Sequence, residues 1–157
     1  METILYLVKK TDPNQLNSMI EDYKKRIQKY HRFDVLTIPD IKNRGKLTQS
    51  IQKQKEGELT LDRVKENDYL VLLDETGRQM DSLLFSNFIN ARRMGSHRRL
   101  IFLIGGPYGF SDSVYKRANE RISLSKMTFS HQIIRLFFLE QLYRANTILT
   151  NEPYHNK

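Results

Sequence analysis

Four apolar runs alternate with segments of helical periodicity, and this alternation is the feature that most constrains the fold. The runs are ILYLV at 4–8, FDVLTIP at 33–39, DYLVLLD at 68–74 and RLIFLIGG at 99–106. In the first, third and fourth runs the apolar residues are consecutive instead of alternating with polar ones, which is typical of strands covered by helices on both faces. Such strands are joined by helical crossovers and run parallel. The sequence therefore predicts a three-layer α/β/α fold around a mostly parallel sheet.

The segments between the runs carry helix signals at their ends. Asp12 and Pro13 suit the N-cap and first turn of a helix whose apolar positions continue to Tyr30 at three- and four-residue spacing. Asp81 is a plausible cap and Gly95 a plausible terminator for another helix. Five further elements are expected: a weaker helix through 47–59, a turn at 75–77, a short helix at 111–121, a short strand at 122–125 and a long helix at 130–149. No repeat or linker interrupts the pattern, so residues 1–157 are predicted to form a single domain.

The net charge of the chain favours a polyanionic partner. Lys and Arg number 26 against 18 Asp and Glu, which gives a formal charge of +8. The basic residues gather in three stretches, at 24–32, 42–46 and 92–99. This pattern favours nucleic acid as the partner, although a basic surface kept for solubility explains the charge as well.

Composition also excludes several classes of site. The chain has no cysteine, so disulfides, thiolate zinc sites and cysteine nucleophiles are excluded. Its four histidines show no ligand spacing, and we expect no metal site. No apolar run reaches the length of a membrane span, and the N-terminus lacks the pattern of a signal peptide. We expect a cytoplasmic protein without membrane contact.

The glycine-rich segment IGGPYGF at 104–110 is the clearest candidate for ligand binding. It follows a predicted strand and precedes a helix, the position at which open α/β sheets bind ligands. A tight strand–helix turn is the alternative explanation. The spacing differs from dinucleotide and P-loop motifs, and Pro107 removes an amide that a pyrophosphate would need. The segment therefore favours a ligand without a phosphate chain.

Four motifs, in their order and spacing, resemble the RlmH family of SPOUT-class RNA methyltransferases. They are VLLDETG at 71–77, LIFLIGGPYGF at 100–110, ISLSKMTFSHQIIRLFFLEQLYRA at 122–145 and NEPYHNK at 151–157. The resemblance extends over essentially the whole chain. It implies a C-terminal trefoil knot, a homodimer, and S-adenosyl-L-methionine as the cofactor. The implied reaction is methylation of N3 of a pseudouridine in helix 69 of 23S rRNA, on the ribosome.

The resemblance also implies where the cofactor binds. S-adenosylmethionine has an adenine, a ribose and a sulfonium but no phosphate, in agreement with the glycine-rich segment. An apolar wall and free backbone groups would suit its adenine, although a core-facing apolar stripe explains Leu124, Met127 and Phe129 equally well. The implied cofactor-binding residues are Leu73, Asp74, Gly105, Gly106, Pro107, Gly109, Leu124, Ser125, Lys126, Met127, Thr128 and Phe129.

Arg144, Tyr154 and His155 are the implied catalytic residues. The N3 imide must lose its proton as it attacks, while negative charge develops on the flanking carbonyls. Arg144 would hold that charge, His155 would accept the proton or orient the base, and Tyr154 would stack on it or hydrogen-bond to it. Two simpler explanations exist: Arg144 pairs with Glu140 one helical turn away, and the terminal residues are solvated.

Two departures from the family pattern are visible, and two other functions remain open. Tyr108 stands where the family often has an acidic residue, and Ser130 stands where it usually has proline. Ser130 can cap the following helix instead. A non-enzymatic RNA- or ribosome-binding module would use the same basic stretches, and a SPOUT enzyme with another RNA target would share the same motifs. We also expect a composite site, in which one subunit's cofactor loop faces the other's tail.

Overall fold

The computed structural model describes residues 1–12, 14–39, 41 and 44–156. A five-stranded sheet crosses the molecule in the order β2-β1-β4-β3-β5, and every pair of neighbouring strands is parallel. The predicted α/β fold with a parallel sheet is thus confirmed. Its strands are β1 (Glu2–Val8), β2 (Phe33–Ile38), β3 (Asp68–Gln79), β4 (Arg99–Ile104) and β5 (Glu120–Ser123).

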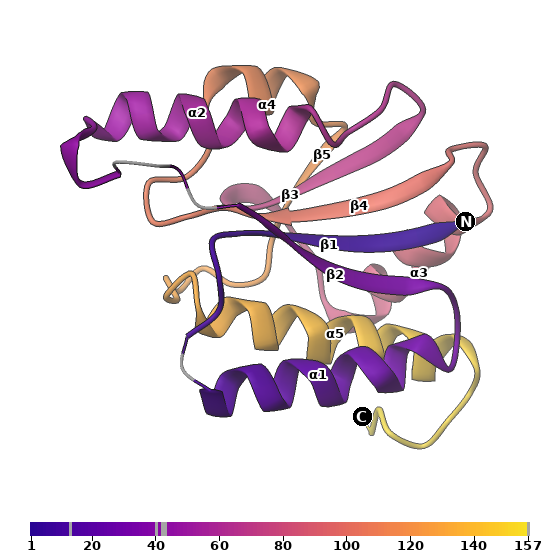
Figure 1. Cartoon of the computed structure of the whole chain (residues 1–157). Coiled ribbons are helices and arrows are strands. Elements are labelled where there is room, and N and C mark those ends of the chain that lie inside the picture. The colour runs from indigo at the N-terminus through magenta and orange to yellow at the C-terminus, as the bar shows by residue number, and fades with distance from the viewer. Residues whose placement is uncertain (13, 40, 42–43, 157) are drawn as a thin grey trace.

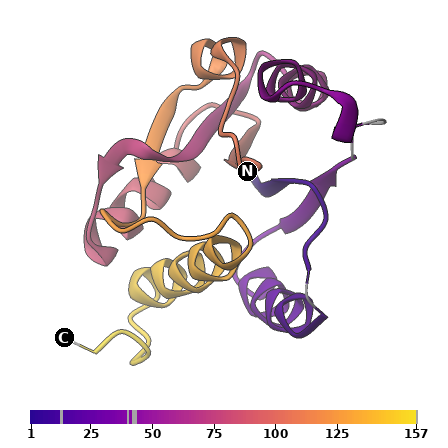
Figure 2. The same ribbon diagram turned by 90° about the vertical axis from the view of Figure 1, so that its left-hand side faces the viewer.

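Helices cover both faces of the sheet and form the predicted three layers (Figures 1 and 2). One face packs against α1, α3 and α5 around Phe102 and Phe138, and the other packs against α2 and α4 around Leu72 and Val114. Apolar residues alternate between these two cores along β1, β4 and the first half of β3, which explains why these sequences are apolar on both faces. The helices are α1 (Asn14–Gln28), α2 (Gln49–Leu61), α3 (Ser82–Arg93), α4 (Asp112–Arg117) and α5 (Ile133–Leu149), and a short 3-10 helix, η1 (Arg44–Lys46), precedes α2.

The predicted ends of the helix between Asp81 and Gly95 are confirmed, whereas the helix predicted at 111–121 is too long, because α4 ends at Arg117 and β5 begins at Glu120. The Asp81 carboxylate accepts the amide N–H of Leu84 at 2.8 Å and caps α3, which ends two residues before Gly95. Ser130 accepts the amide N–H of Ile133 at 3.1 Å, the capping role predicted for it. Because one turn intervenes, α5 begins at Ile133, three residues later than predicted. The predicted role of Pro13 lies outside the described residues.

The turn predicted at 75–77 is wrong, because these residues lie within β3. Leu73 and Arg78 both pair with Ile122 of β5, so the residues between them form a bulge in a continuous strand. A Cβ atom on Gly77 would lie 2.5 Å from the backbone nitrogen of Ile122. The missing side chain is therefore what lets the bulge approach β5 so closely. The fifth strand also begins at Glu120, two residues before its predicted start.

A fully buried arginine joins the start of α5 to the loop after β1. Arg135 is 0% exposed. Its guanidinium donates to the carbonyl of Val8 at 2.8 Å, to the Oγ1 of Thr11 at 2.7 Å and to the carbonyl of His131 at 3.1 Å. Burial lowers the pKa of Arg135 to about 10, and the three acceptors compensate for its desolvation. This contact fixes the chain where it enters α5, next to the carboxyl ends of the strands.

Candidate functional site

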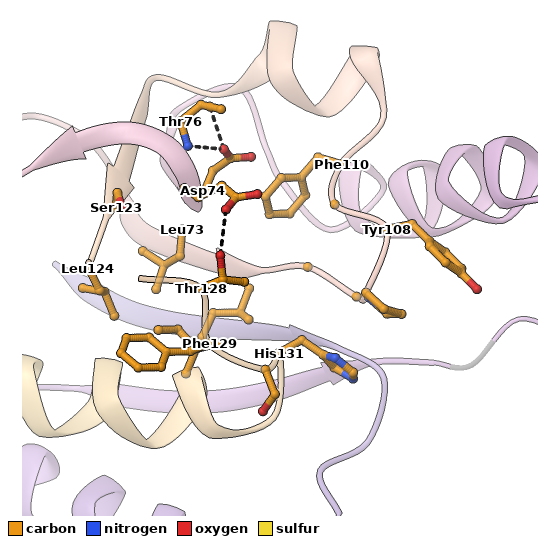
Figure 3. Close-up of a pocket in the computed structure, with 18 of the residues that line it drawn as sticks. Leu73, Asp74, Thr76, Tyr108, Phe110, Ser123, Leu124, Thr128, Phe129 and His131 are labelled. Atoms are coloured by element: carbon orange, nitrogen blue, oxygen red, sulfur yellow. Dashed lines mark hydrogen bonds between the residues drawn. The ribbon is translucent and has the colours of Figure 1, made fainter. Parts of the chain in front are cut away.

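A cavity of about 700 Å³ lies at the carboxyl ends of β3, β4 and β5 (Figure 3). Three chain segments surround it, and they are the three that the sequence predicts: the end of the third strand, the glycine-rich loop and the segment after β5. Within the described residues, Lys126 is the only member of the predicted cofactor set that does not line it. The predicted residues that line it are Leu73, Asp74, Gly105, Gly106, Pro107, Gly109, Leu124, Ser125, Met127, Thr128 and Phe129.

The glycine-rich loop is both a tight turn and a wall of the cavity. The amide N–H of Gly109 donates to the carbonyl of Gly106 at 3.2 Å, and Gly109 has φ +76°, a conformation that favours glycine. Pro107 and Tyr108 form the tip of the turn, and the Tyr108 ring is 41% exposed. The segment is therefore a tight strand–helix turn that also lines the cavity, and its binding of a ligand stays a prediction.

The segment after β5 supplies an apolar wall and an irregular backbone. The hydroxyl of Ser123 donates to the carbonyl of Ser125 at 2.8 Å, and the amide N–H of Met127 donates to the hydroxyl of Ser125 at 2.9 Å. Leu124 is half-buried beside the core of α1, α3 and α5, whereas Met127 is 73% exposed and Phe129 38% exposed. Leu124 thus belongs partly to the core, while Met127 and Phe129 remain available to a ligand.

Asp74 is held by a hydrogen-bond network at the bulge of β3. Its Oδ1 accepts the amide N–H and the hydroxyl of Thr76, at 2.8 and 2.6 Å, and its Oδ2 accepts the hydroxyl of Tyr115. Burial acts to raise the pKa of Asp74, but the hydrogen bonds from Thr76 and Tyr115 outweigh it and the pKa is lowered. Burial and the same carboxylate raise the pKa of Tyr115 to about 12. The Arg121 guanidinium lies 4.3 Å from the centroid of the Tyr115 ring.

Several residues that line the cavity are not in the cofactor-binding set predicted from the sequence. Glu75 and Thr76 belong to the VLLDETG motif, so the motif was a signal for them. His131 follows the segment after β5 directly, and Gln49 and Lys53 come from α2, for which no sequence signal points to the cavity. The additional lining residues are Gln49, Lys53, Glu75, Thr76, Ile104, Tyr108, Phe110, Tyr115, Ile122, Ser123, Ser130, His131 and Ile134.

Arg144, Tyr154 and His155 form a second cluster, at the far end of α5. The Cζ of Arg144 lies 4.8 Å from the centroid of the Tyr154 ring, and its Nη1 lies 3.4 Å from His155 Nδ1. None of the three is among the described residues that line the cavity. Ile134 does line it, and ten helical residues separate it from Arg144, about 15 Å along the axis. Within one chain, the predicted cofactor cavity and the predicted catalytic residues are therefore separate.

The chain's last residues are anchored to α1 and α5. Tyr154 donates its hydroxyl to Glu140 at 3.0 Å, and its ring centroid lies 4.8 Å from that of Tyr143. Tyr30 donates to the carboxylate of Glu152 at 2.7 Å. Burial, with hydrogen bonds involving Tyr23 and Glu140, raises the pKa of Tyr154 well above its usual range. Arg144 also pairs with Glu140, as the simpler explanation anticipated.

Two of the three basic stretches lie at the same edge of the sheet. The stretch at 24–32 joins α1 to β2 and the stretch at 92–99 joins α3 to β4, so both lie at the amino ends of the strands. Several of their members have carboxylate partners: Lys24 pairs with Asp34 at 2.9 Å, and Arg99 pairs with Asp68. The third stretch includes Lys42, which lies outside the described residues.

Neither a metal cluster nor a membrane span is found in the part of the chain that the structure describes. Groups of three or more acidic or histidine side chains able to hold a metal ion are absent there. Each helix in the same residues is too short or too polar to cross a lipid bilayer.

Comparison with known proteins decides the family. A family profile described as "Predicted SPOUT methyltransferase" matches residues 1–155. The chain belongs to the SPOUT methyltransferase family. It is 55% identical over 153 residues to the ribosomal RNA large subunit methyltransferase H of Christiangramia forsetii, covering 98% of each chain. It is 52% identical to the protein of the same name from Parabacteroides distasonis, over the full length of both.

Two solved methyltransferase structures with bound cofactor share only 12% and 13% identity with this SPOUT family member. The SpoU methyltransferase AviRb from Streptomyces viridochromogenes, solved with AdoMet, shares 13% identity with it and has a TM-score of 0.45. The match covers 90% of this chain and 56% of that one. At this level of similarity the match supports no statement about the site.

Proposed function

We propose that this chain is an S-adenosylmethionine-dependent methyltransferase that modifies N3 of a pseudouridine in helix 69 of 23S rRNA, on the ribosome. One observation carries the proposal: segments distant in sequence converge on one cavity at the carboxyl ends of the strands, in a chain about half identical to proteins named ribosomal RNA large subunit methyltransferase H. The family membership supports methyl transfer, and the names of the relatives support ribosomal RNA as the acceptor.

The cavity suits the cofactor in size and chemistry. About 700 Å³ lies within the usual range for a small-molecule site. The loop at 105–109 and the irregular segment at 124–129 present backbone donors and acceptors for an adenine edge, and Leu73, Ile104 and Leu124 give an apolar surface for its ring. When bound, S-adenosylmethionine supplies an electrophilic methyl group. The residues around it exclude water and hold it in position, which contributes much of the rate of an in-line displacement.

We propose that the reactive cluster of one subunit completes the cavity of another in a homodimer. The separation of Arg144, Tyr154 and His155 from the cavity within one chain motivates this. Phe129 and Phe137, with ring centroids 5.0 Å apart, are 38% and 40% exposed and give an apolar surface beside the cavity that a second copy can cover. Equal mixing of a His155→Ala chain with a chain whose cavity is blocked should restore one active site per heterodimer. No restoration would contradict a composite site.

The cluster suggests how the residues share the reaction. Arg144 is a permanent donor, so His155 Nδ1 facing its Nη1 must act as the acceptor, which leaves the proton on Nε2. That Nε2 is buried and has no hydrogen-bond partner among the described residues. In this tautomer His155 can donate to a carbonyl that flanks N3 once a shift of the tail exposes Nε2, and Arg144 stabilises the developing charge. The arrangement favours base orientation over proton acceptance by His155, with Tyr154 held against both.

Three coarser features complete the proposal. We propose that residues 1–157 form one domain, since the described helices all lie on the faces of one sheet. We propose the trefoil knot of SPOUT proteins for the C-terminal part, supported by family membership and by the placement of segment 124–132 between β5 and α5. An experimental structure would contradict the knot if its backbone trace, pulled in thought from both ends, became a straight line. A cytoplasmic location fits an enzyme that acts on ribosomes.

The proposed function is tested by methyl transfer in vitro. Ribosomes from a host lacking the gene are incubated with the purified protein and S-adenosylmethionine labelled in its methyl group. We expect label in the large-subunit rRNA and none in ribosomes from the parent strain, which are already modified. Binding of S-adenosylmethionine without any transfer to rRNA would favour another RNA target. No binding at all would favour the non-enzymatic RNA-binding module.

A further inference from the structure

Two carboxylates line the cavity, and they differ in how their oxygens are used. Both oxygens of Asp74 are occupied, one by Thr76 and the other by Tyr115. Glu75, the next residue, is exposed and has one hydrogen-bond contact in the described part of the chain, a long one of 3.4 Å from the hydroxyl of Thr128. Asp74 is thus committed to the fold, whereas Glu75 has acceptor capacity left for a ligand.

The contact of Glu75 crosses the cavity. Glu75 lies in the bulge of β3, and Thr128 lies in the segment after β5, 53 residues later. The Thr128 hydroxyl points toward the strand side of the cavity, along the dashed contact in Figure 3. The Thr128 hydroxyl therefore occupies the position from which a hydrogen-bond donor of a ligand could reach the Glu75 carboxylate.

The other charged groups of the cavity define what Glu75 must provide. Lys53, on α2, is a permanent cation in the lining. Burial first, and then Arg135 and Lys9, lower the pKa of His131, which favours its neutral form. The cofactor carries a sulfonium and an α-ammonium against one carboxylate, and the protein around it has a net charge of +8. A cation in this cavity needs a carboxylate, and Glu75 is the one with free oxygen lone pairs.

We propose that Glu75 binds the α-ammonium group of the cofactor and takes its hydrogen bonds in place of the one from Thr128. This rests on the proposed function, since it assigns a role at the same cavity. The ammonium is favoured over the sulfonium because it donates hydrogen bonds, as the Thr128 hydroxyl does, and a sulfonium has no proton to donate. Glu75 is therefore a specificity residue for the amino-acid part of the cofactor.

Binding of three ligands tests the assignment, by calorimetry and without any turnover. S-adenosylmethionine and S-adenosylhomocysteine both carry the α-ammonium, whereas methylthioadenosine lacks the amino-acid part. The Glu75→Gln variant should bind the first two about 10-fold more weakly, as expected for loss of a charge-assisted hydrogen bond, and should bind methylthioadenosine as the wild type does. Glu58→Gln is the matched control, because Glu58 is exposed on α2 and contacts Gln54 only weakly, at 3.5 Å.

Each other outcome overturns the assignment in a distinct way. Weaker binding of S-adenosylmethionine alone would assign Glu75 to the sulfonium. Equal weakening of all three ligands would give Glu75 a structural role in the cavity wall, and no change in any of them would remove it from the site. If the wild-type protein binds none of the three, the proposed function itself fails.

Discussion

The guanidinium of Arg144 lies over the ring of Tyr154, with its Cζ 4.8 Å from the ring centroid, so the last residues of the chain are fixed to α5. Tyr154 is held further by its hydrogen bond to Glu140 and by the ring of Tyr143. The tail thus has a defined position although it protects little core. Because the tail makes few contacts, its effect on stability and its effect on the reaction can be measured separately.

Removal of residues 154–157 should abolish methyl transfer and leave the protein folded. Among the described residues the deletion removes the ring contact with Tyr143, the hydrogen bond to Glu140 and two contacts with Arg144, so the unfolding free energy should fall by only about 1–3 kcal/mol. Urea unfolding, sedimentation and methylation of ribosomes measure the three properties. Removal of residues 156–157 alone is the control and should retain activity. A truncated protein that still methylates at the wild-type rate would contradict the role of Tyr154 and His155.

Arg135 should be a major contributor to stability. Arg135→Met removes the donors to Val8, Thr11 and His131 and leaves buried acceptors without partners, so the unfolding free energy should fall by about 2–4 kcal/mol. Arg78→Met is the matched control, since Arg78 is 59% exposed and its pair with Glu120, at 3.7 Å, contributes at most about 0.5 kcal/mol. Chemical denaturation compares the two. A loss no larger for Arg135 than for Arg78 would show that burial of the guanidinium is not compensated as we describe.

Gly77 should tolerate no side chain. A Cβ atom there would meet the backbone of Arg121 and Ile122 at 2.5–2.6 Å, and backbone cannot move aside cheaply. Gly77→Ala should therefore shift β5 away from β3, lower the unfolding free energy by about 2 kcal/mol or more, and weaken cofactor binding at the adjoining cavity. Gly45→Ala is the control, because nothing lies within 4 Å of a Cβ there. Similar melting temperatures for the two variants would contradict the close approach of the strands.

Stability should fall on acidification because of His31. Burial first, and then the charge of Arg93, lower the pKa of His31 to about 4 from its usual value of 6.5. His31 therefore binds a proton more readily in the unfolded chain than in the folded one. The stability that the neutral, buried His31 contributes is fully present above pH 6.5 and is lost as the pH falls toward 4. The loss should reach about 1–2 kcal/mol near pH 4.5, less than a fully buried ring would give.

His31→Gln is the variant that isolates this effect. The difference in unfolding free energy between it and the wild type should shrink between pH 7 and pH 4.5. A constant difference across that range would show that His31 titrates normally in the folded protein.

Much of the fold could be predicted because its strands are apolar on both faces and its helices carry Ser or Asp caps. The bulge in β3 could not, because DETG is typical of a turn and only the pairing with β5 holds these residues in a strand. The start of β5 was missed for a related reason. Glu120 and Arg121 are polar, and an edge strand with one neighbour tolerates polar residues where a central strand does not.

The candidate site could be predicted only where a motif marks it. The segments around Gly105 and Thr128 belong to motifs, and the fold brings them together as expected. Lys53 belongs to no motif, because its place at the cavity depends on how α2 crosses from β2 to β3. The distance between Ile134 and Arg144 follows from the length of α5, which places the two ends of one motif at the cavity and at the reactive cluster, in agreement with the composite site expected from the sequence.

The most direct test of the central claim is to map 3-methylpseudouridine in the large-subunit rRNA of the host. The gene is deleted and then restored as wild type or as His155→Ala, and the helix 69 fragment is analysed by mass spectrometry. The account predicts that one methyl group is lost from a pseudouridine in that hairpin, returns with the wild-type gene and does not return with the variant. Unchanged methylation after deletion would contradict the proposed function and leave the fold and the family intact.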